Sequence, residues 1–244
     1  MYKGYITFKN KASNSSDLKL IMTAPPLITH SEIRHDTFTI PGRDGDLFSK
    51  DIYRGNASVK VSFDLATTGA VGNYTTAMNK VYQWLQGTGN LIISDEPGVF
   101  YEVKKVMITT DQRDIVNYGH IEAEFIVYPY KFLDQTNQST IALSITNNYD
   151  ECWPLYVYNS LYAGQERIFS VNGNTMKVTM EESFSRAYID TRRQIAYHMD
   201  GNTKIEIQVA GDYRKLALLP GNNSITIATS GDSIETTPRW GYKI

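Results

Sequence analysis

Four histidines and three adjacent carboxylate pairs are the residues of this 244-residue chain that could support metal binding or acid–base chemistry. His30 and His35 are five residues apart, which places them on opposite faces of a strand, and no cysteine or carboxylate completes a metal-ligand spacing. The pairs are Asp95-Glu96, Asp150-Glu151 and Glu181-Glu182. Because neighbouring side chains of a strand point to opposite faces, such a pair cannot flank one glycosidic bond. We therefore predict no metal, no cofactor and no catalytic residue.

A glycine-rich segment, Gly42-Arg43-Asp44-Gly45, is followed by Asp46 and has the composition of a tight turn. Asp44-Gly45-Asp46 lacks the further ligands and the closing glutamate of an EF-hand loop. Asp-Gly supplies the positive φ angles of a hairpin tip, and residues 38–40 and 47–48 have the character of its strands. The residues themselves indicate a plain hairpin turn.

Aromatic side chains gather at Trp153, Tyr156, Tyr158 and Tyr162, and such rings can stack on sugars. This reading predicts a carbohydrate-binding module with Trp153, Tyr156 and Tyr158 as its platform. The other reading places Trp153 at the start of a core strand, with Tyr156 and Tyr158 sharing one buried face. We favour the core strand and keep the lectin as the alternative function.

Alternating apolar residues surround one amphipathic helix in the first half of the chain. Val59, Val61, Phe63 and Leu65 have the period of a half-buried strand, as do Ile121, Ala123, Phe125 and Val127. Between these strands, Ala77, Val81, Trp84 and Leu85 recur at helical spacing, with Asn73 as N-cap and Gly87 at the C-terminal end. We predict a helix over about 74–86 with Trp84 as its core anchor.

The composition shift at residues 134–139 predicts a linker between two domains, 1–133 and 140–244. The second half contains closely spaced short strands, a strong Asn172-Gly173 turn and no helical run, which is typical of a β-sandwich. The predicted fold class is mainly β. It has two sandwich-like domains, the first with one packed helix.

A net charge of −2 without basic runs predicts no nucleic-acid specificity. No window has the roughly 20 apolar residues that span a bilayer, so membrane insertion is not expected. The opening Met1-Tyr2-Lys3-Gly4-Tyr5 lacks the apolar region of a signal peptide, which predicts synthesis in the cytoplasm without export.

Several short motifs occur in a recognisable order along the chain. They are residues 40–47 with Gly42, Arg43, Asp44 and Gly45; Trp84-Leu85; Asp95-Glu96-Pro97; Tyr118-Gly119; Pro129-Tyr130; residues 212–225; and Pro238-Arg239-Trp240. In this order they resemble the distal tail (Dit) proteins of long-tailed phages and prophages of Gram-positive bacteria. The resemblance implies a ring-forming first domain, a galectin-like second domain, and assembly or structural roles for Gly42, Arg43, Asp44, Gly45, Trp84, Leu85, Asp95, Pro97, Pro129 and Tyr130.

The resemblance also implies a non-enzymatic structural virion protein located at the tail tip. Its expected partner is first of all itself, in a homo-hexameric ring. The other expected partners are the tail tube protein, the tape-measure protein, a tail-associated lysin or tail-tip protein, and a receptor-binding or baseplate protein. The second domain would dock the host-recognition components.

Overall fold

The computed structural model describes residues 2–67, 73–134, 138–162, 164–181 and 183–244, without the side chains of residues 49–52. The chain divides into two compact units, Met1–Phe132 with Lys243–Ile244, and Leu133–Tyr242. The predicted second domain ran to Ile244, whereas the last two residues lie in the first unit. Residues 135–137 of the predicted linker lie outside the described residues.

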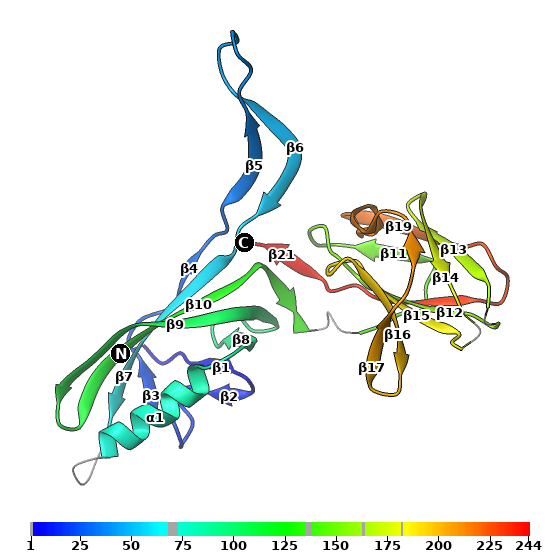
Figure 1. Ribbon diagram of the computed structural model, residues 1–244. Coiled ribbons are helices and arrows are strands. Elements are labelled where there is room, and N and C mark those ends of the chain that lie inside the picture. Colours follow the sequence, from blue (N-terminus) through cyan, green and yellow to red (C-terminus); the bar gives the residue numbers. More distant parts are fainter. Residues whose placement is uncertain (1, 68–72, 135–137, 163, 182) are drawn as a thin grey trace. The chain divides into compact units, whose positions relative to one another are not determined.

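Within the described part of the first unit, nine strands form one curled sheet in the order β2-β1-β8-β9-β10-β7-β3, and β21 and β4 pair with β10 and β7 (Figure 1). The strands are β1 (Ile6–Phe8), β2 (Lys11–Ala12), β3 (Leu20–Met22), β4 (Leu27–Thr29), β7 (Ala57–Ala66), β8 (Gly89–Ile93), β9 (Val99–Ile115), β10 (Tyr118–Leu133) and β21 (Gly241–Lys243). Strands β7 and β10 pair from Ala66↔Tyr118 to Ala57↔Val127, so their alternating apolar residues share one buried face.

Helix α1 (Asn73–Leu85) packs on the buried face of this sheet. Tyr74, Met78, Val81, Trp84 and Leu85 form its buried stripe at helical spacing. Gly87 follows with φ +84°, the left-handed conformation that ends many helices. The predicted helix is therefore confirmed, with a start and an end one residue earlier than predicted.

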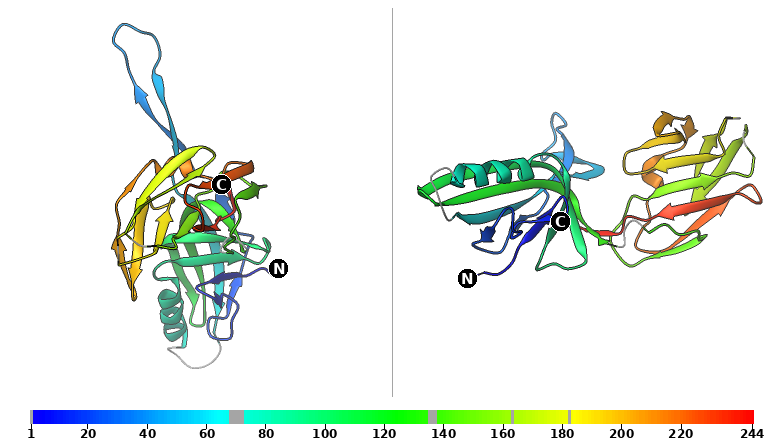
Figure 2. Two further views of the ribbon diagram at one scale, coloured as in Figure 1. Left: turned by 90° about the vertical axis from the view of Figure 1, so that its right-hand side faces the viewer. Right: turned by 90° about the horizontal axis from the view of Figure 1, so that it is seen from below.

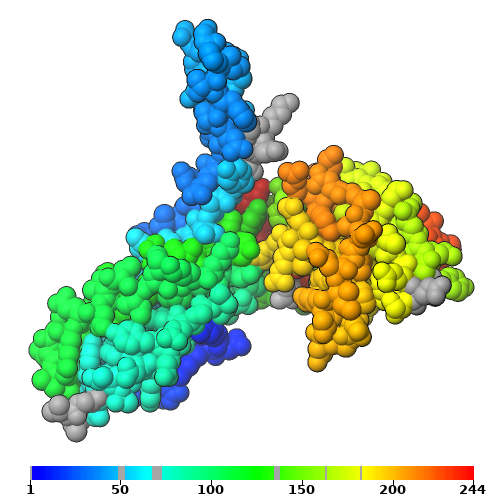
Figure 3. Space-filling model, viewed as in Figure 1, coloured from blue at the N-terminus to red at the C-terminus, as the bar shows by residue number. Residues whose placement is uncertain are grey.

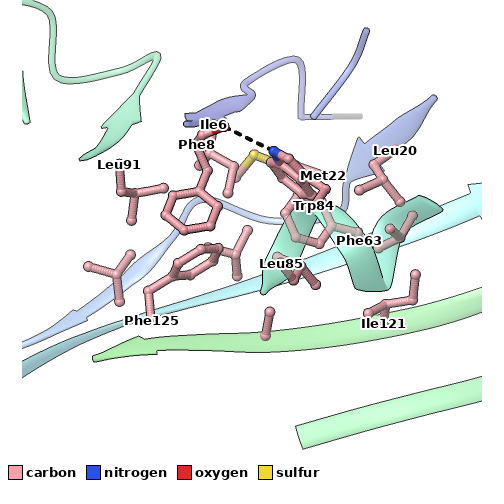
Figure 4. Close-up of a cluster of buried hydrophobic side chains, with 14 of the residues drawn as sticks. Ile6, Phe8, Leu20, Met22, Phe63, Trp84, Leu85, Leu91, Ile121 and Phe125 are labelled. Atoms are coloured by element: carbon pink, nitrogen blue, oxygen red, sulfur yellow. Dashed lines mark hydrogen bonds between the residues drawn. The ribbon is translucent and has the colours of Figure 1, made fainter. Parts of the chain in front are cut away.

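Trp84 lies at the centre of the core that α1 and the sheet enclose (Figure 4). Its indole N–H donates to the Phe8 carbonyl oxygen over 3.0 Å. Its ring meets the rings of Phe8 and Phe63 edge-on at centroid distances of 6.2 and 6.3 Å. Leu85 is also buried beside it. Both residues of the Trp84-Leu85 motif thus have a place in the core.

Gly119 on β10 lies where a larger residue does not fit. A Cβ at this position would lie 2.0 Å from the Tyr74 hydroxyl and 2.6 Å from the Gln112 carbonyl oxygen. Because the second contact is with main chain, rotating Tyr74 away cannot relieve it. We expect Gly119→Ala to lower the free energy of unfolding by about 1–3 kcal/mol, the usual range for overpacking. Urea denaturation measures this loss, and Gly119→Ala with Tyr74→Phe should recover only part of it.

The second unit is a sandwich of two five-stranded sheets, counted over its described residues. One sheet has the order β11-β19-β13-β14-β18 and the other β17-β16-β15-β12-β20. The elements are β11 (Ser144–Asn147), β12 (Leu155–Asn159), β13 (Glu166–Val171), β14 (Asn174–Thr179), β15 (Arg186–Asp190), β16 (Ile195–Asp200), β17 (Thr203–Glu206), β18 (Val209–Ala210), the 3-10 helix η2 (Tyr213–Leu216), β19 (Gly221–Ile227) and β20 (Ser233–Thr237). Phe169, Met176 and Ile189 belong to the core between the sheets. The mainly β fold class with one packed helix is confirmed.

Two further strands, β5 (Ile33–Phe38) and β6 (Leu47–Arg54), form a separate two-stranded sheet. Figures 1 and 2 show this ribbon projecting from the curled sheet of the first unit. We call residues 33–54 the arm. Over the described residues, no helix is both long and apolar enough to cross a membrane.

Candidate assembly site

The arm exposes apolar side chains on both of its faces. Cross-strand partners share a face, so Ile33, Thr37 and Phe48 lie on one side and Tyr53 and Phe38 on the other. The exposed fractions of Ile33, Phe38, Phe48 and Tyr53 are 53, 56, 64 and 52%. All six residues of β5 are exposed, and Figure 3 shows the arm standing clear of the curled sheet. Among the side chains of the arm that the structure describes, these large apolar residues therefore form no buried core.

Main-chain pairing from Ile33↔Arg54 to Phe38↔Leu47 joins the two strands of the arm, and side chains also meet across it. His35 meets Phe48 edge-on with 4.3 Å between ring centroids, and the Thr39 hydroxyl donates to Asp46 over 2.9 Å. An isolated two-stranded hairpin is marginally stable in water, because three strands or a packed neighbour are needed to bury an apolar face. A surface of another molecule that covers the arm would supply this burial.

The predicted turn residues Gly42, Arg43, Asp44 and Gly45 form the tip of the arm, between β5 and β6. Gly42 and Gly45 have φ of +81° and +80°, and the Arg43 amide donates to the Ile40 carbonyl oxygen over 3.2 Å. All four residues are exposed. The sequence located this tip. The flanking strands were also predicted, but not the exposure of Phe38 and Phe48, for which two phenylalanines on either side of an Asp-Gly turn were the available signal.

Asp95 and Pro97 are exposed residues of the turn between β8 and β9. The turn is fastened to the N-terminal segment, since the Ser94 amide donates to the Tyr5 carbonyl oxygen over 3.0 Å and the Tyr2 hydroxyl donates to Asp95. The Tyr101 hydroxyl on β9 donates to Glu96 of the turn over 2.5 Å. This arrangement is a braced surface turn, separate from the arm.

Pro129 and Tyr130 lie near the end of β10. Pro129 is buried, and its carbonyl oxygen accepts the Ile244 amide over 3.1 Å, next to the β21–β10 pairing. The Tyr130 ring stacks on Phe132 at a centroid distance of 6.1 Å. The structure therefore distributes the predicted assembly residues over a tip, a core, a turn and a strand end, and does not bring them into one site.

The face of β7 and β10 opposite the core carries charged groups. His120 lies between two carboxylates, with Nδ1 3.0 Å from Asp64 and Nε2 3.6 Å from Glu122. The hydrogen bond to Asp64 is the main cause that raises the pKa of His120 above its ordinary value. The Tyr118 hydroxyl donates to the same Asp64 over 2.6 Å. These groups form a polar, mutually paired surface.

The sugar platform predicted by the lectin reading is not formed by these residues. Tyr156 and Tyr158 are fully buried, with their rings 5.6 and 6.0 Å from that of Phe169. Their hydroxyls donate to the Leu216 carbonyl oxygen and to Asp232, each over 2.8 Å. Trp153 is half-buried, and its carbonyl oxygen accepts from Arg239. Tyr156 and Tyr158 point into the sandwich because alternation places them on the core side of β12.

Groups suited to metal or thiol chemistry are also sparse. In the described stretches, no cluster of three or more His, Cys, Asp or Glu side chains is placed to hold a metal ion. Cys152 is buried, and this burial raises the pKa of its thiol to about 12, which keeps it protonated near neutral pH.

Comparison with known proteins shows likeness in fold. No protein-family model and no curated protein matches the sequence. The crystal structure of the Dit protein (gp 19.1) of phage SPP1, described as a paradigm of the hub adsorption apparatus in Gram-positive infecting phages, matches with a TM-score of 0.64 and 13% identity. The match covers 96% of this chain and 98% of that one.

A second match is a chain of the phage P2 baseplate in its activated conformation with Ca, with a TM-score of 0.54 and 8% identity over 97% of this chain and 98% of that one. The Sr form of the p2 baseplate matches with a TM-score of 0.51 and 7% identity, over 96% and 97% of the two chains. The predicted resemblance is thus confirmed at the level of the fold, and this chain is a Dit-like protein in its architecture.

Proposed function

We propose that this chain is the hub protein at the distal end of a phage tail. Six copies would form a ring that joins the tail tube and tape-measure proteins to a tail-tip protein or tail-associated lysin. The second unit would dock receptor-binding or baseplate proteins, and the role includes no catalytic step. The near-full-length likeness in fold to the SPP1 hub protein supports this proposal.

The observation that carries the proposal is the uncovered apolar arm. Exposed patches of large apolar residues mark surfaces that bind another protein. In such a ring the arm would bind a different part of the neighbouring chain, and a heterologous contact of this kind can close into a ring. A neighbouring copy would bury Ile33, Phe38, Phe48 and Tyr53, which an isolated ribbon cannot bury by itself.

The edge strands of the first unit are weaker candidates for this contact. Strands β2 and β3 end the sheet path and have only two and three residues. Pro25 and Pro26 follow β3, and β2 contains Lys11, which pairs with Asp17 over 3.0 Å. Short strands, lysine and proline are the usual means of preventing sheet extension at an edge. The proposed ring contact therefore centres on the arm.

Phe48→Asp is expected to abolish the ring. Phe48 is 64% exposed, so its replacement removes a large apolar contact from the arm and introduces a charge that the interface would have to desolvate. Loss of a central aromatic anchor typically weakens an interface by about 2 kcal/mol or more, or roughly 30-fold for each contact. Native mass spectrometry and negative-stain images should show six-membered rings for the parent and monomers for the variant.

The matched control is Ile141→Asp, because Ile141 is 70% exposed but lies in the second unit. This variant should form rings like the parent. A parent that stays monomeric with and without tail tube protein would refute the proposal. Rings formed by Phe48→Asp would show that the arm is not the contact that forms the ring. Glycan binding by a monomeric parent would favour a lectin, with a platform other than Tyr156 and Tyr158.

A further inference from the structure

The base of the arm is fastened by a residue from the far end of the sequence. The arm joins the curled sheet through two short junctions, residues 30–32 and 55–56. Ser31 in the first junction is 7% exposed, although the β5 residues that follow are all exposed. The Ser31 amide donates to the Ile244 main-chain oxygen over 3.1 Å, and the Ser31 hydroxyl donates to the same oxygen.

Ile244 connects this junction to the sheet. Its amide donates to the Pro129 carbonyl oxygen over 3.1 Å, and its side chain, 5% exposed, belongs to the core of the first unit. On the other strand of the arm, Nη1 of Arg54 donates to the Ser31 hydroxyl over 3.2 Å. Both strands of the arm are thus tied through Ser31 and Ile244 to β10, and Figure 1 shows the C-terminal residue at the foot of the arm.

We propose that Ser31 and Ile244 are positioning residues for the arm, and that they hold it in the orientation in which a second copy of the chain binds it. This inference rests on the proposed ring. A ribbon attached by two short junctions can pivot, and a pivoting arm would lose that freedom on binding. When only a fraction of molecules has the binding-competent orientation, the apparent affinity falls by that fraction.

The contacts that tie Ser31 through Ile244 to β10, which we call the brace, also imply an order for synthesis and assembly. Residues 133–242 form the second unit and separate the arm in sequence from Ile244. A chain that has been synthesised only as far as β10 therefore has an arm without its brace. On this basis the arm binds a neighbour at full affinity only after the second unit has been synthesised and β21 has returned to β10.

The test compares two double variants of the full chain. Ser31→Ala with Ile244→Ala weakens the brace: it removes the hydrogen bonds of the Ser31 hydroxyl and most of the buried Ile244 side chain, and it leaves the main-chain hydrogen bonds in place. The control, Ser13→Ala with Ile93→Ala, replaces a fully buried serine and a 2% exposed isoleucine of the same unit, away from the base of the arm. Both variants should weaken the core similarly, so protection of β7 and β10 against hydrogen exchange should fall to a similar extent in both.

Hydrogen exchange of dilute monomer gives the deciding measurement. Amides of residues 31–35 and 53–55 should exchange at least ten-fold faster in the brace variant than in the control. Equal exchange at the base of the arm in the two variants would overturn the inference. This readout does not require a ring, so it remains decisive even if the parent fails to assemble and the proposed function falls.

Assembly gives a second measurement when the parent forms rings. If one molecule in ten keeps the competent orientation, the association constant of each contact should fall about ten-fold in the brace variant, and rings should appear only at correspondingly higher concentration. The control should assemble at the concentration of the parent. Normal assembly of a variant with a freely exchanging arm base would also contradict the positioning role.

Discussion

Trp84→Ala is expected to lower the free energy of unfolding of the first unit by about 3–5 kcal/mol, the range for removing a large buried aromatic side chain. Trp84 is 6% exposed and lies where α1 meets the sheet. Its rings contact Phe8 and Phe63, which come from β1 and β7, so the cavity would affect three elements at once. Urea denaturation followed by far-UV circular dichroism measures the loss.

Trp84→Phe separates packing from hydrogen bonding in the same position. Phenylalanine keeps an aromatic ring but cannot donate to the Phe8 carbonyl oxygen, which the indole N–H reaches over 3.0 Å. An unpaired buried acceptor costs about 1–3 kcal/mol, so this variant should lie between the parent and Trp84→Ala. Superimposable denaturation curves for Trp84→Ala and the parent would contradict the central position of this residue.

Local periodicity explains why the helix and the central strands could be predicted. Val81, Trp84 and Leu85 fall on one side of a helix, and all three are buried in the structure. Val59 and Phe63 on β7 alternate with exposed or half-exposed residues, and they too are buried. In both cases the buried face is a property of neighbouring residues, and a short stretch of sequence contains all the information.

Contacts between distant residues have no comparable signal. The pairing of β21 with β10 joins segments that are more than 100 residues apart. Ser31 and Ile244, which are also hydrogen-bonded, are 213 residues apart. Nothing in the pattern around Ile244 distinguishes an ordinary last strand of the second unit from one that returns to the first. The predicted domain boundary therefore placed Ile244 in the second domain.

The candidate site was predictable only in part, for a related reason. The Asp-Gly turn indicates that a hairpin exists, but not whether the hairpin packs on the domain or projects from it. Phe38 and Phe48 have the character of core residues in sequence and are more than half exposed in the structure. Tyr156 and Tyr158 lie in the core, as the favoured core-strand interpretation predicted, and not on the platform that the alternative lectin reading required. The exposure of a side chain depends on which helices and strands pack against it, and the local pattern of one sequence does not contain this information.

The second large effect that we expect is a loss of stability when Asp190 is replaced, because Asp190 is held by Arg239 and Arg193 in an arrangement that we call the clamp. Both carboxylate oxygens of Asp190 accept from Arg239, over 2.7 and 3.0 Å, and the Arg193 amide donates to Asp190 over 3.2 Å. The Asp190 side chain is 4% exposed and that of Arg239 is 18% exposed. Asp190→Asn leaves the guanidinium of Arg239 largely buried without its counter-charge, and removal of one partner of such a pair typically costs about 3–5 kcal/mol.

The matched control for this substitution is Glu235→Gln, which removes the charge of the partly exposed pair with Arg186 and leaves an amide oxygen that can still accept from Asn159. The two side chains of that pair are 27 and 50% exposed, and exposed pairs typically contribute about 0–1 kcal/mol. Urea denaturation at pH 7 should therefore separate Asp190→Asn clearly from the parent and leave Glu235→Gln close to it. Equal curves for the two variants would show that the clamp contributes no more than a surface pair.

Acid should remove the difference between the parent and Asp190→Asn. Burial alone would raise the pKa of Asp190, but the hydrogen bonds and charge of Arg239, with those of Arg193, outweigh it and hold the pKa below its usual value. A carboxyl group whose pKa is lower in the folded state stabilises the fold fully above its unfolded-state pKa of about 3.9, and this contribution is lost as the pH falls through the folded-state pKa. The free energies of unfolding of parent and variant should therefore differ most above about pH 5, begin to converge as the pH falls below about 4, and become equal only below the folded-state pKa of Asp190. A difference that stays constant from pH 7 to pH 2 would mean that the cost of Asp190→Asn arises from altered packing and not from the lost charge.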